Sequence, residues 1–185
     1  GWAKIETQKV EKTEMAIKVY GSPVSTCTGR VVACIEELDL EYELVPVDLT
    51  TGEHKRAPHI DRNPFGQIPA LEDGKVVLFE SRVITRYLAR QYGKGKGGHL
   101  LKEESPAEAA AVDQWIEVEA QHFNGPISTI VFQILFLPVF FGGKTDEAVV
   151  AAEVEKLGKV LDVYEARLSK TKYLAGEKYS LADLH

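Results

Sequence analysis

The stretch from Asn63 to Ala70, which reads Asn-Pro-Phe-Gly-Gln-Ile-Pro-Ala, holds residues that could bind a peptide. Ile68-Pro69 precedes a strand-like segment, a position that favours a cis peptide bond. A cis bond there would turn the backbone outward and leave the N–H and C=O groups of Ile68 free to pair with an extended peptide, as in strand addition. The sequence therefore predicts a peptide-binding edge at Ile68, and a plain turn is the alternative of equal weight.

Glu80-Ser81 lies ten residues beyond Ala70, where a strand pattern changes to a helix pattern. A helix N-terminus binds carboxylates through its free N–H groups. Ser25 has a similar place before the first predicted helix, and from the residue alone it is interpreted as a helix cap. This region thus offers a peptide edge and an anion site, and a simple turn with a helix cap is the structural alternative.

The two cysteines, Cys27 and Cys34, are predicted to be free thiols. Seven residues along one helix separate them by about 10 Å, which is too far for a disulfide. Free thiols fit a reducing compartment such as the cytosol. Cys27 also lies near the N-terminus of its helix, where the pKa of a thiol can fall.

The elements that would position these residues begin with a strand, a helix and a strand. Residues 16–20 and 42–47 show strand patterns, and Ser25-Thr26 begins a helix between them. One face of that helix carries its apolar residues, Val31, Val32, Ile35 and Leu38. This order predicts a βαβ unit with parallel strands.

A hairpin and a second helix are predicted next. Residues 70–72 and 75–79 are strand-like around Asp73-Gly74, a strong signal for a two-residue hairpin turn. The helix pattern at 81–92 directs four large residues inward, namely Val83, Ile84, Tyr87 and Leu88. Together these elements predict a small mixed sheet with helices packed on it.

Only helix patterns follow residue 94. Ser105-Pro106-Ala107-Glu108 combines a capping box with proline in the first turn. The helix that it begins directs Val112, Trp115 and Ile116 inward, and a helix from about Thr145 has an apolar seam at Val150, Val154, Leu157, Leu161, Tyr164 and Leu168. We therefore predict a tail at 1–14, an α/β domain at 15–94, a linker at 95–104 and an all-α domain at 105–185.

The composition is that of an ordinary globular protein, with 44% apolar and 27% charged residues among 185. A net charge of -6 argues against a nucleic-acid partner, because phosphate contacts need clustered Lys and Arg. We find no signal peptide in residues 1–14. The most apolar run, Pro126 to Phe141, is shorter than the roughly 20 residues that span a bilayer. It is therefore predicted to be a buried helix or a pocket wall, and no membrane partner is expected.

The order of elements and a series of motifs resemble the glutathione transferases, and within them the plant phi class. The motifs are Ser25 after the first strand, Glu53-His54-Lys55, the stretch 62–70, Phe79-Glu80-Ser81-Arg82, Trp115 to Ala120, Val163 to Leu168 and Tyr173-Leu174-Ala175-Gly176. The resemblance runs from about Met15 to the last residue. It implies a thioredoxin-like, glutathione-binding N-terminal domain, a helical C-terminal domain, a homodimer and a cytoplasmic location.

The resemblance also implies an enzyme that transfers glutathione to hydrophobic electrophiles, which is a detoxification activity. Reduction of organic hydroperoxides would use the same thiolate, and glutathione is a substrate with no metal expected. The serine that hydrogen-bonds the glutathione sulfur falls on Ser25. A thiol with a pKa of about 8.5 is mostly protonated at neutral pH, and a hydroxyl donor at a helix N-terminus stabilises the thiolate. Ser25 would thus be an activator and not a nucleophile.

Seven further residues are implied to bind glutathione, namely Glu53, His54, Lys55, Gln67, Ile68, Glu80 and Ser81. The segment at 53–55 would approach the glycine carboxylate, and Gln67-Ile68 would pair with the peptide backbone. Ser81 and its helix N-terminus would bind the γ-glutamyl carboxylate, and Glu80 the ammonium group. For Glu53 a solvated charged loop is the alternative.

The electrophile pocket is less defined, and aromatic residues at helical spacing are more often core than pocket wall. Its candidates are Trp115, Phe123, Ile127, Ile130, Phe132 and Phe136. Catalysis by Cys27 is an alternative to the role of Ser25, although thiol-exchange relatives place cysteine at the Ser25 position.

The family pattern continues for several helices beyond His185, and the first of them normally packs centrally. Ser180 and Asp183 form its cap pattern, so the chain resembles a truncated member. We expect the seams at Trp115 and Leu161 to lose a packing partner. A non-catalytic protein that binds hydrophobic ligands, or an inactive fragment, is therefore the alternative to the enzyme. The sequence identifies no natural electrophile.

Overall fold

In the computed structural model, which describes residues 17–93 and 99–185, β1 (Ile17–Gly21) lies inside a mixed sheet of order β2-β1-β3-β4. It pairs parallel with β2 (Tyr42–Pro46) and antiparallel with β3 (Ala70–Asp73). β4 (Val76–Phe79) completes the predicted hairpin around Gly74, whose φ is +58°. The predicted βαβ unit and hairpin are confirmed, whereas the tail predicted at 1–14 lies outside the described residues.

Two long helices of the first half, α1 (Thr26–Glu37) and α3 (Ser81–Tyr92), pack on each other. α3 has the predicted bounds, but Val83 was wrongly predicted to face inward and is 46% exposed. Between β2 and β3 the chain forms a 3₁₀ turn, η1 (Glu53–Lys55), and one turn of helix, α2 (His59–Arg62). These short elements lead into the predicted cis bond at Ile68–Pro69, which is confirmed.

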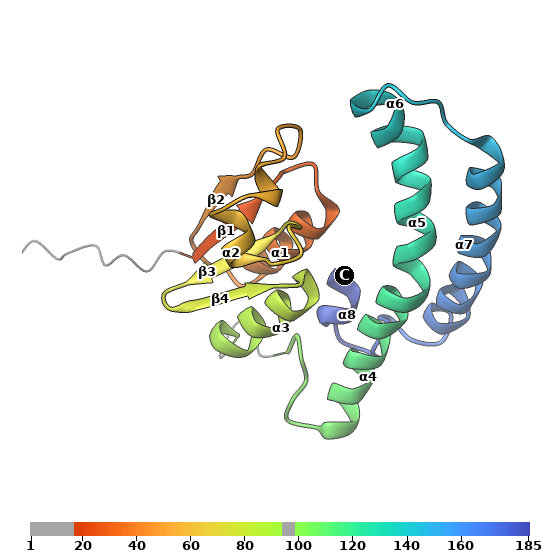
Figure 1. Ribbon diagram of the computed structural model, residues 1–185. Helices are drawn as coiled ribbons and strands as arrows, with labels where there is room; N and C mark the ends of the chain where they lie inside the picture. The colour runs from red at the N-terminus through yellow and green to blue at the C-terminus, as the bar shows by residue number, and fades with distance from the viewer. Residues whose placement is uncertain (1–16, 94–98) are drawn as a thin grey trace, which may run out of the picture.

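The second half begins with one continuous helix, Pro106–Phe140, capped by Ser105. It consists of α4 (Pro106–Val118), a π segment η2 (Glu119–Phe123), α5 (Asn124–Val131), a second π segment η3 (Phe132–Phe136) and α6 (Leu137–Phe140). A window of 18 residues in this helix has a mean hydropathy of 1.6, so by length and composition alone the helix would be able to cross a membrane. α7 (Glu147–Leu168) runs back beside α5, as Figure 1 shows.

A single turn of helix, α8 (Leu181–Leu184), lies between the two halves and contacts both α1 and α4 (Figure 1). The predicted capping box at Ser180 and Asp183 is formed. Leu181 is fully buried in the main core, together with Leu100, although residues 95–104 were predicted as a linker. The core thus continues across the junction between the α/β half and the helical half.

Of the two seams that were expected to lose a packing partner, that of Trp115 is covered and that of Leu161 is not. Trp115 keeps a packing partner. Only 8% of it is exposed, and its ring packs edge-on against the ring of Tyr164, with 5.2 Å between the ring centroids. The seam of α7 is exposed in part, as expected for Leu161, because Val154, Leu161 and Leu168 are 53%, 46% and 44% exposed. The reason is that α7 packs mainly on α5 and η2, so only one side of the helix is covered.

Candidate functional site

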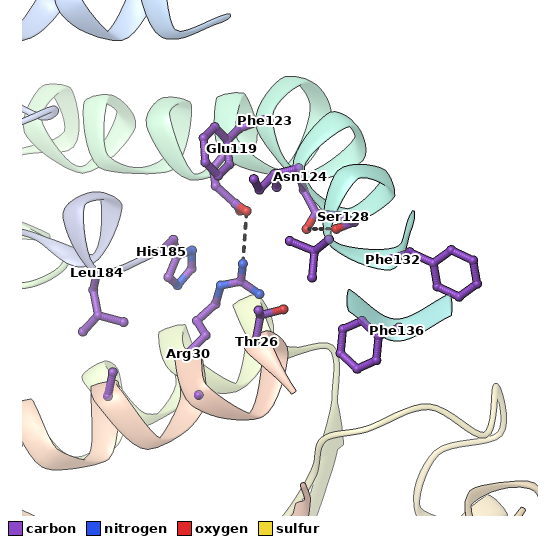
Figure 2. A pocket seen from close by; sticks show the side chains of 14 residues that line it. Thr26, Arg30, Glu119, Phe123, Asn124, Ser128, Phe132, Phe136, Leu184 and His185 are labelled. Carbon is purple, nitrogen blue, oxygen red and sulfur yellow. Dashed lines mark hydrogen bonds and ion pairs between the residues drawn. The ribbon is translucent and has the colours of Figure 1, made fainter. Parts of the chain in front are cut away.

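Two cavities of different size lie around the first turn of α1. The larger has a volume of about 630 Å³ (Figure 2). It lies between α1, α8 and the part of the long helix that comprises η2, α5 and η3. The smaller has a volume of about 60 Å³. The smaller cavity is lined by Cys27, Asn63, Gln67, Ile68, Pro69, Glu80, Ser81 and Arg82. Four of the eight predicted glutathione-binding residues, Gln67, Ile68, Glu80 and Ser81, are therefore brought together there.

Ser25 is the N-cap of α1, as the sequence predicted from the residue alone. Its Oγ accepts a hydrogen bond from the Thr28 N–H at 3.3 Å. This bond uses an oxygen lone pair and leaves the hydroxyl proton able to point to another acceptor. The next residue, Thr26, lines the large cavity, and Cys27 lines the small one. Ser25 thus begins the turn that the two cavities share.

The carbonyl of Gln67 is held by two side chains. His59 Nε2 lies 2.8 Å from this oxygen and Asn63 Nδ2 lies 2.9 Å from it. A carbonyl oxygen only accepts, so His59 must carry its proton on Nε2, and its Nδ1 is buried without a partner in the described part of the chain. These bonds fix the peptide that precedes the half-buried Ile68, which belongs to none of the strands. His59 and Asn63 were not predicted as site residues.

The η1 turn is joined to the 63–70 stretch at Gly66. Lys55 Nζ donates to the Phe65 carbonyl at 3.0 Å, and a Cβ added to Gly66 would lie 2.7 Å from the His54 carbonyl oxygen. Burial lowers the pKa of His54, and the charges of Lys55 and His59 lower it further. His54 is therefore neutral at pH 7, where it can donate one hydrogen bond but adds no charge for a carboxylate.

Glu53 has a local partner that fits the charged-loop alternative. Its carboxylate accepts a hydrogen bond from the Asp48 N–H at 2.8 Å on the exposed surface. Glu53, His54 and Lys55 line neither of the two cavities, and neither does Ser25. These four residues are therefore not brought to the same point as the other four predicted residues. Their roles toward glutathione stay predictions.

We expect Gly66→Ala to destabilise the protein more than Gly52→Ala. Both glycines have positive φ, +56° and +72°, but a Cβ on Gly52 would meet no atom within 4 Å. The backbone strain alone should cost about 1 kcal/mol in each variant. The contact with His54 should add about 1–3 kcal/mol for Gly66→Ala. Urea unfolding followed by circular dichroism measures the difference in unfolding midpoint between the two variants. Equal midpoints would show that the η1 turn shifts to make room for the added Cβ at little cost.

Glu80 and Ser81 stand at the start of α3 in different environments. Glu80 is exposed, has a φ of +70° and makes no side-chain cap bond, while Ser81 is 4% exposed. The Ser81 hydroxyl accepts a hydrogen bond from Arg30 Nη1 at 2.8 Å. The predicted anion site at Ser81 thus lies beside the Arg30 guanidinium of α1, which no sequence pattern indicated.

A buried charge cluster, which we call the Arg30–Glu119–Arg82 cluster, joins the two halves behind Ser81. Arg30 Nη2 lies 3.0 Å from one oxygen of Glu119, and Arg82 lies 2.6 Å from the other. Figure 2 shows Arg30 extending from α1 toward Glu119 on the long helix. The side chains of Arg30 and Glu119 are each only 7% exposed. Their separation in sequence explains why no local pattern indicated them.

The wall of the large cavity is mostly apolar on the side of the long helix. It is lined by Thr26, Gly29, Arg30, Ala33, Glu119, Phe123, Asn124, Ile127, Ser128, Val131, Phe132, Phe136, Leu184 and His185. Four of the six predicted pocket residues are among them, whereas Trp115 and Ile130 are core residues, each 8% exposed. The run at 126–141 therefore forms the predicted pocket wall in part, but Ile134, Leu135 and Val139 are exposed.

Cys27 and Cys34 are both free, as predicted. Cys34 is fully buried, and burial raises the pKa of its thiol to about 12, so it is inert at neutral pH. Within residues 17–93 and 99–185 there is no cluster of three or more His, Cys, Asp or Glu that could hold a metal ion.

Comparisons with known proteins agree with this geometry. Residues 15–90 match the family model "Glutathione S-transferase, N-terminal domain", and residues 125–185 match "Glutathione S-transferase, C-terminal domain". The chain is 50% identical to glutathione S-transferase F13 of Arabidopsis thaliana over 171 residues, which are 92% of this chain and 77% of that protein.

Solved structures give the same result. Glutathione transferase F7 from Populus trichocarpa is 55% identical, with a TM-score of 0.87 over 92% of this chain and 79% of the other. Glutathione S-transferase I from maize, solved with an atrazine glutathione conjugate, is 50% identical, with a TM-score of 0.84 over 91% and 77%.

Proposed function

Because the chain belongs to the plant phi class of glutathione S-transferases, we propose that it transfers glutathione to hydrophobic electrophiles and that Ser25 activates the thiol. The family uses glutathione as its substrate, and the maize relative was solved with a glutathione conjugate. The observation that carries the proposal is the first turn of α1. It begins at Ser25 and contributes Thr26 and Gly29 to the large cavity and Cys27 to the small one.

In this proposal the small cavity holds the γ-glutamyl end of glutathione. Ile68 pairs with its backbone, and Ser81, Glu80 and the N-terminus of α3 bind its carboxylate and ammonium groups. The Ser25 O–H donates to the sulfur, which stabilises the thiolate over the thiol. The thiolate then attacks an electrophilic carbon of a ligand in the large cavity, and its electron pair forms the new C–S bond. The displaced group leaves with the electron pair of the bond that breaks.

The same thiolate supports reduction of organic hydroperoxides. Its attack on the peroxide oxygen would give an alcohol and a glutathione sulfenic acid, and a second glutathione would convert the latter to the disulfide and water. We also propose a cytoplasmic location, a homodimer and a detoxification role, on the family resemblance alone. Sedimentation analysis tests the dimer, and a monomer at micromolar concentration would contradict it.

The test of the proposed function is conjugation of glutathione to a chromogenic aromatic electrophile by the 185-residue chain, with glutathione affinity measured by calorimetry. Turnover above the uncatalysed rate supports the enzyme. Glutathione binding without turnover would instead favour the non-catalytic ligand-binding alternative. If neither is found, the family activity does not apply to this chain.

A further inference from the structure

The peptide that joins Gln67 to Ile68 is held through its carbonyl oxygen. This oxygen accepts hydrogen bonds from His59 at 2.8 Å and from Asn63 at 2.9 Å. Ile68 lines the small cavity, and its backbone forms no hydrogen bond within the described residues. In a planar trans peptide the N–H points opposite to the C=O. The two bonds that fix the carbonyl therefore also fix the direction of the Ile68 N–H.

The two donors differ in their other contacts. Asn63 lines the small cavity, and its Oδ1 also accepts the Phe65 N–H at 3.1 Å, so its side chain shapes the turn in which it lies. His59 is 2% exposed and lines neither cavity, and its ring bonds to the Gln67 carbonyl alone. Replacing Asn63 would change several contacts at once, whereas replacing the His59 ring removes a single bond to the peptide.

The helix that carries His59 is attached to the sheet. His59 is the first residue of α2 and Arg62 is the last. Arg62 Nε lies 2.6 Å from a carboxylate oxygen of Glu72 on β3, and the Arg62 guanidinium lies 3.9 Å from the centre of the Tyr20 ring on β1. Because α2 is joined in this way to two strands, His59 holds the Gln67 carbonyl from a fixed base.

We propose that His59 is a positioning residue for glutathione, which holds the Gln67–Ile68 peptide in the orientation that pairs with the glutathione backbone. The inference rests on the function proposed above, because it concerns the thiol site of the same reaction. Without the His59 bond the peptide populates further orientations, and the apparent affinity falls with the fraction of molecules that remain competent to bind. Ser25 is not affected, so bound glutathione reacts at an unchanged rate.

The test compares His59→Leu with His59→Gln on the full chain, by steady-state kinetics and by calorimetry with glutathione. Leucine removes the donor together with the unpaired Nδ1, and the Gln67 carbonyl keeps its bond from Asn63. His59→Leu should raise KM for glutathione and weaken its binding about 3- to 10-fold, the effect of one hydrogen bond. The values of kcat and of KM for the electrophile should not change, as expected when only ground-state binding is lost.

His59→Gln should restore most of the affinity, because the glutamine amide presents an N–H group near the position of Nε2. An unchanged KM for glutathione in His59→Leu would overturn the proposal. So would an equal loss of affinity in the two variants, because the hydrogen bond would then not be the cause.

Tyr92→Phe is the matched control. The Tyr92 hydroxyl donates to the buried carboxylate of Asp73 at 2.6 Å, and Tyr92 lines neither cavity. This variant removes one hydrogen bond from the same half of the protein and should leave KM for glutathione unchanged. A KM raised as much as in His59→Leu would show that affinity follows overall stability, which would contradict a specific role of His59.

A nuclear magnetic resonance measurement separates this inference from the proposed function. If the chain binds no glutathione, the proposed function fails, but the amide resonance of Ile68 still reports on the peptide. This resonance should be single and narrow in the unsubstituted protein and in His59→Gln. It should be broadened or doubled by conformational exchange in His59→Leu. A single narrow resonance in His59→Leu would overturn the inference.

Discussion

Ser25→Ala is expected to lower kcat for conjugation by about 10²- to 10³-fold, the usual effect of losing one donor to a developing anion. The hydroxyl is the group at the cap of α1 that can donate to the sulfur, and alanine removes it without changing either cavity wall. The pH dependence of turnover should move to higher pH in the variant, because the thiol loses the bond that favours its ionised form. Steady-state kinetics over a range of pH measures both effects.

Ser105→Ala is the matched control. Ser105 caps α4 and accepts the Glu108 N–H at 3.4 Å, much as Ser25 accepts the Thr28 N–H, but the helical turn that it begins contributes no residue to either cavity. Both variants should lose about 1 kcal/mol of stability with the cap. Only Ser25→Ala should lose turnover. Similar turnover in the two variants would show that Ser25 is only a helix cap. Cys27 would then be the alternative candidate for the reactive group.

Glu119→Gln should destabilise the protein by about 3–5 kcal/mol, the range for breaking a buried ion pair. The amide keeps the shape of the side chain but leaves the buried Arg30 and the partly buried Arg82 without a counter-charge. Urea unfolding, followed by tryptophan fluorescence and by circular dichroism, measures the loss.

Glu155→Gln serves as the comparison, because Glu155 pairs with Lys159 at 2.8 Å with both side chains 73% exposed. It should change stability by less than about 0.5 kcal/mol. A similarly small change for Glu119→Gln would mean that the cluster contributes little to holding the two halves together.

The α/β half was predictable because its signals are local. Asp73-Gly74 specifies a hairpin turn with its two neighbouring strands, and Ile68-Pro69 marks the bend before β3. A strand is recognised from its alternation over a few residues, and β2 and β4 each pair with the strand that precedes them in the chain, although β3 pairs with β1 across the connection that holds β2. The candidate site follows from the same signals where it is built from backbone turns, as at Ser25 and Ser81.

The Arg30–Glu119–Arg82 cluster could not be predicted in this way. Arg30 and Glu119 are 89 residues apart, and Arg82 and Glu119 are 37 apart, so no spacing pattern relates them. On the sequence, Arg30 is a charged residue beside an apolar helical face. Only the packing of α1 and α3 against the long helix gives it a buried partner.

The pocket wall was only partly predicted because of the two π segments. A π turn contains more residues than an α turn, so η2 and η3 each change which side of the helix the following residues face. A constant helical period applied across 119–136 therefore assigns some residues to the wrong side. Ile130 was wrongly assigned to the pocket, whereas Val131 and Ser128 were missed.

The first turn of α1 also bears on how such a protein can diverge. Thr26 and Cys27 are neighbours in sequence but face different cavities, since successive helical residues point about 100° apart. A single substitution at Thr26 can therefore alter which electrophiles are accepted without touching the small cavity. Duplicated copies of the gene can therefore acquire new electrophile ranges by changes at Thr26 and still use glutathione as the thiol substrate.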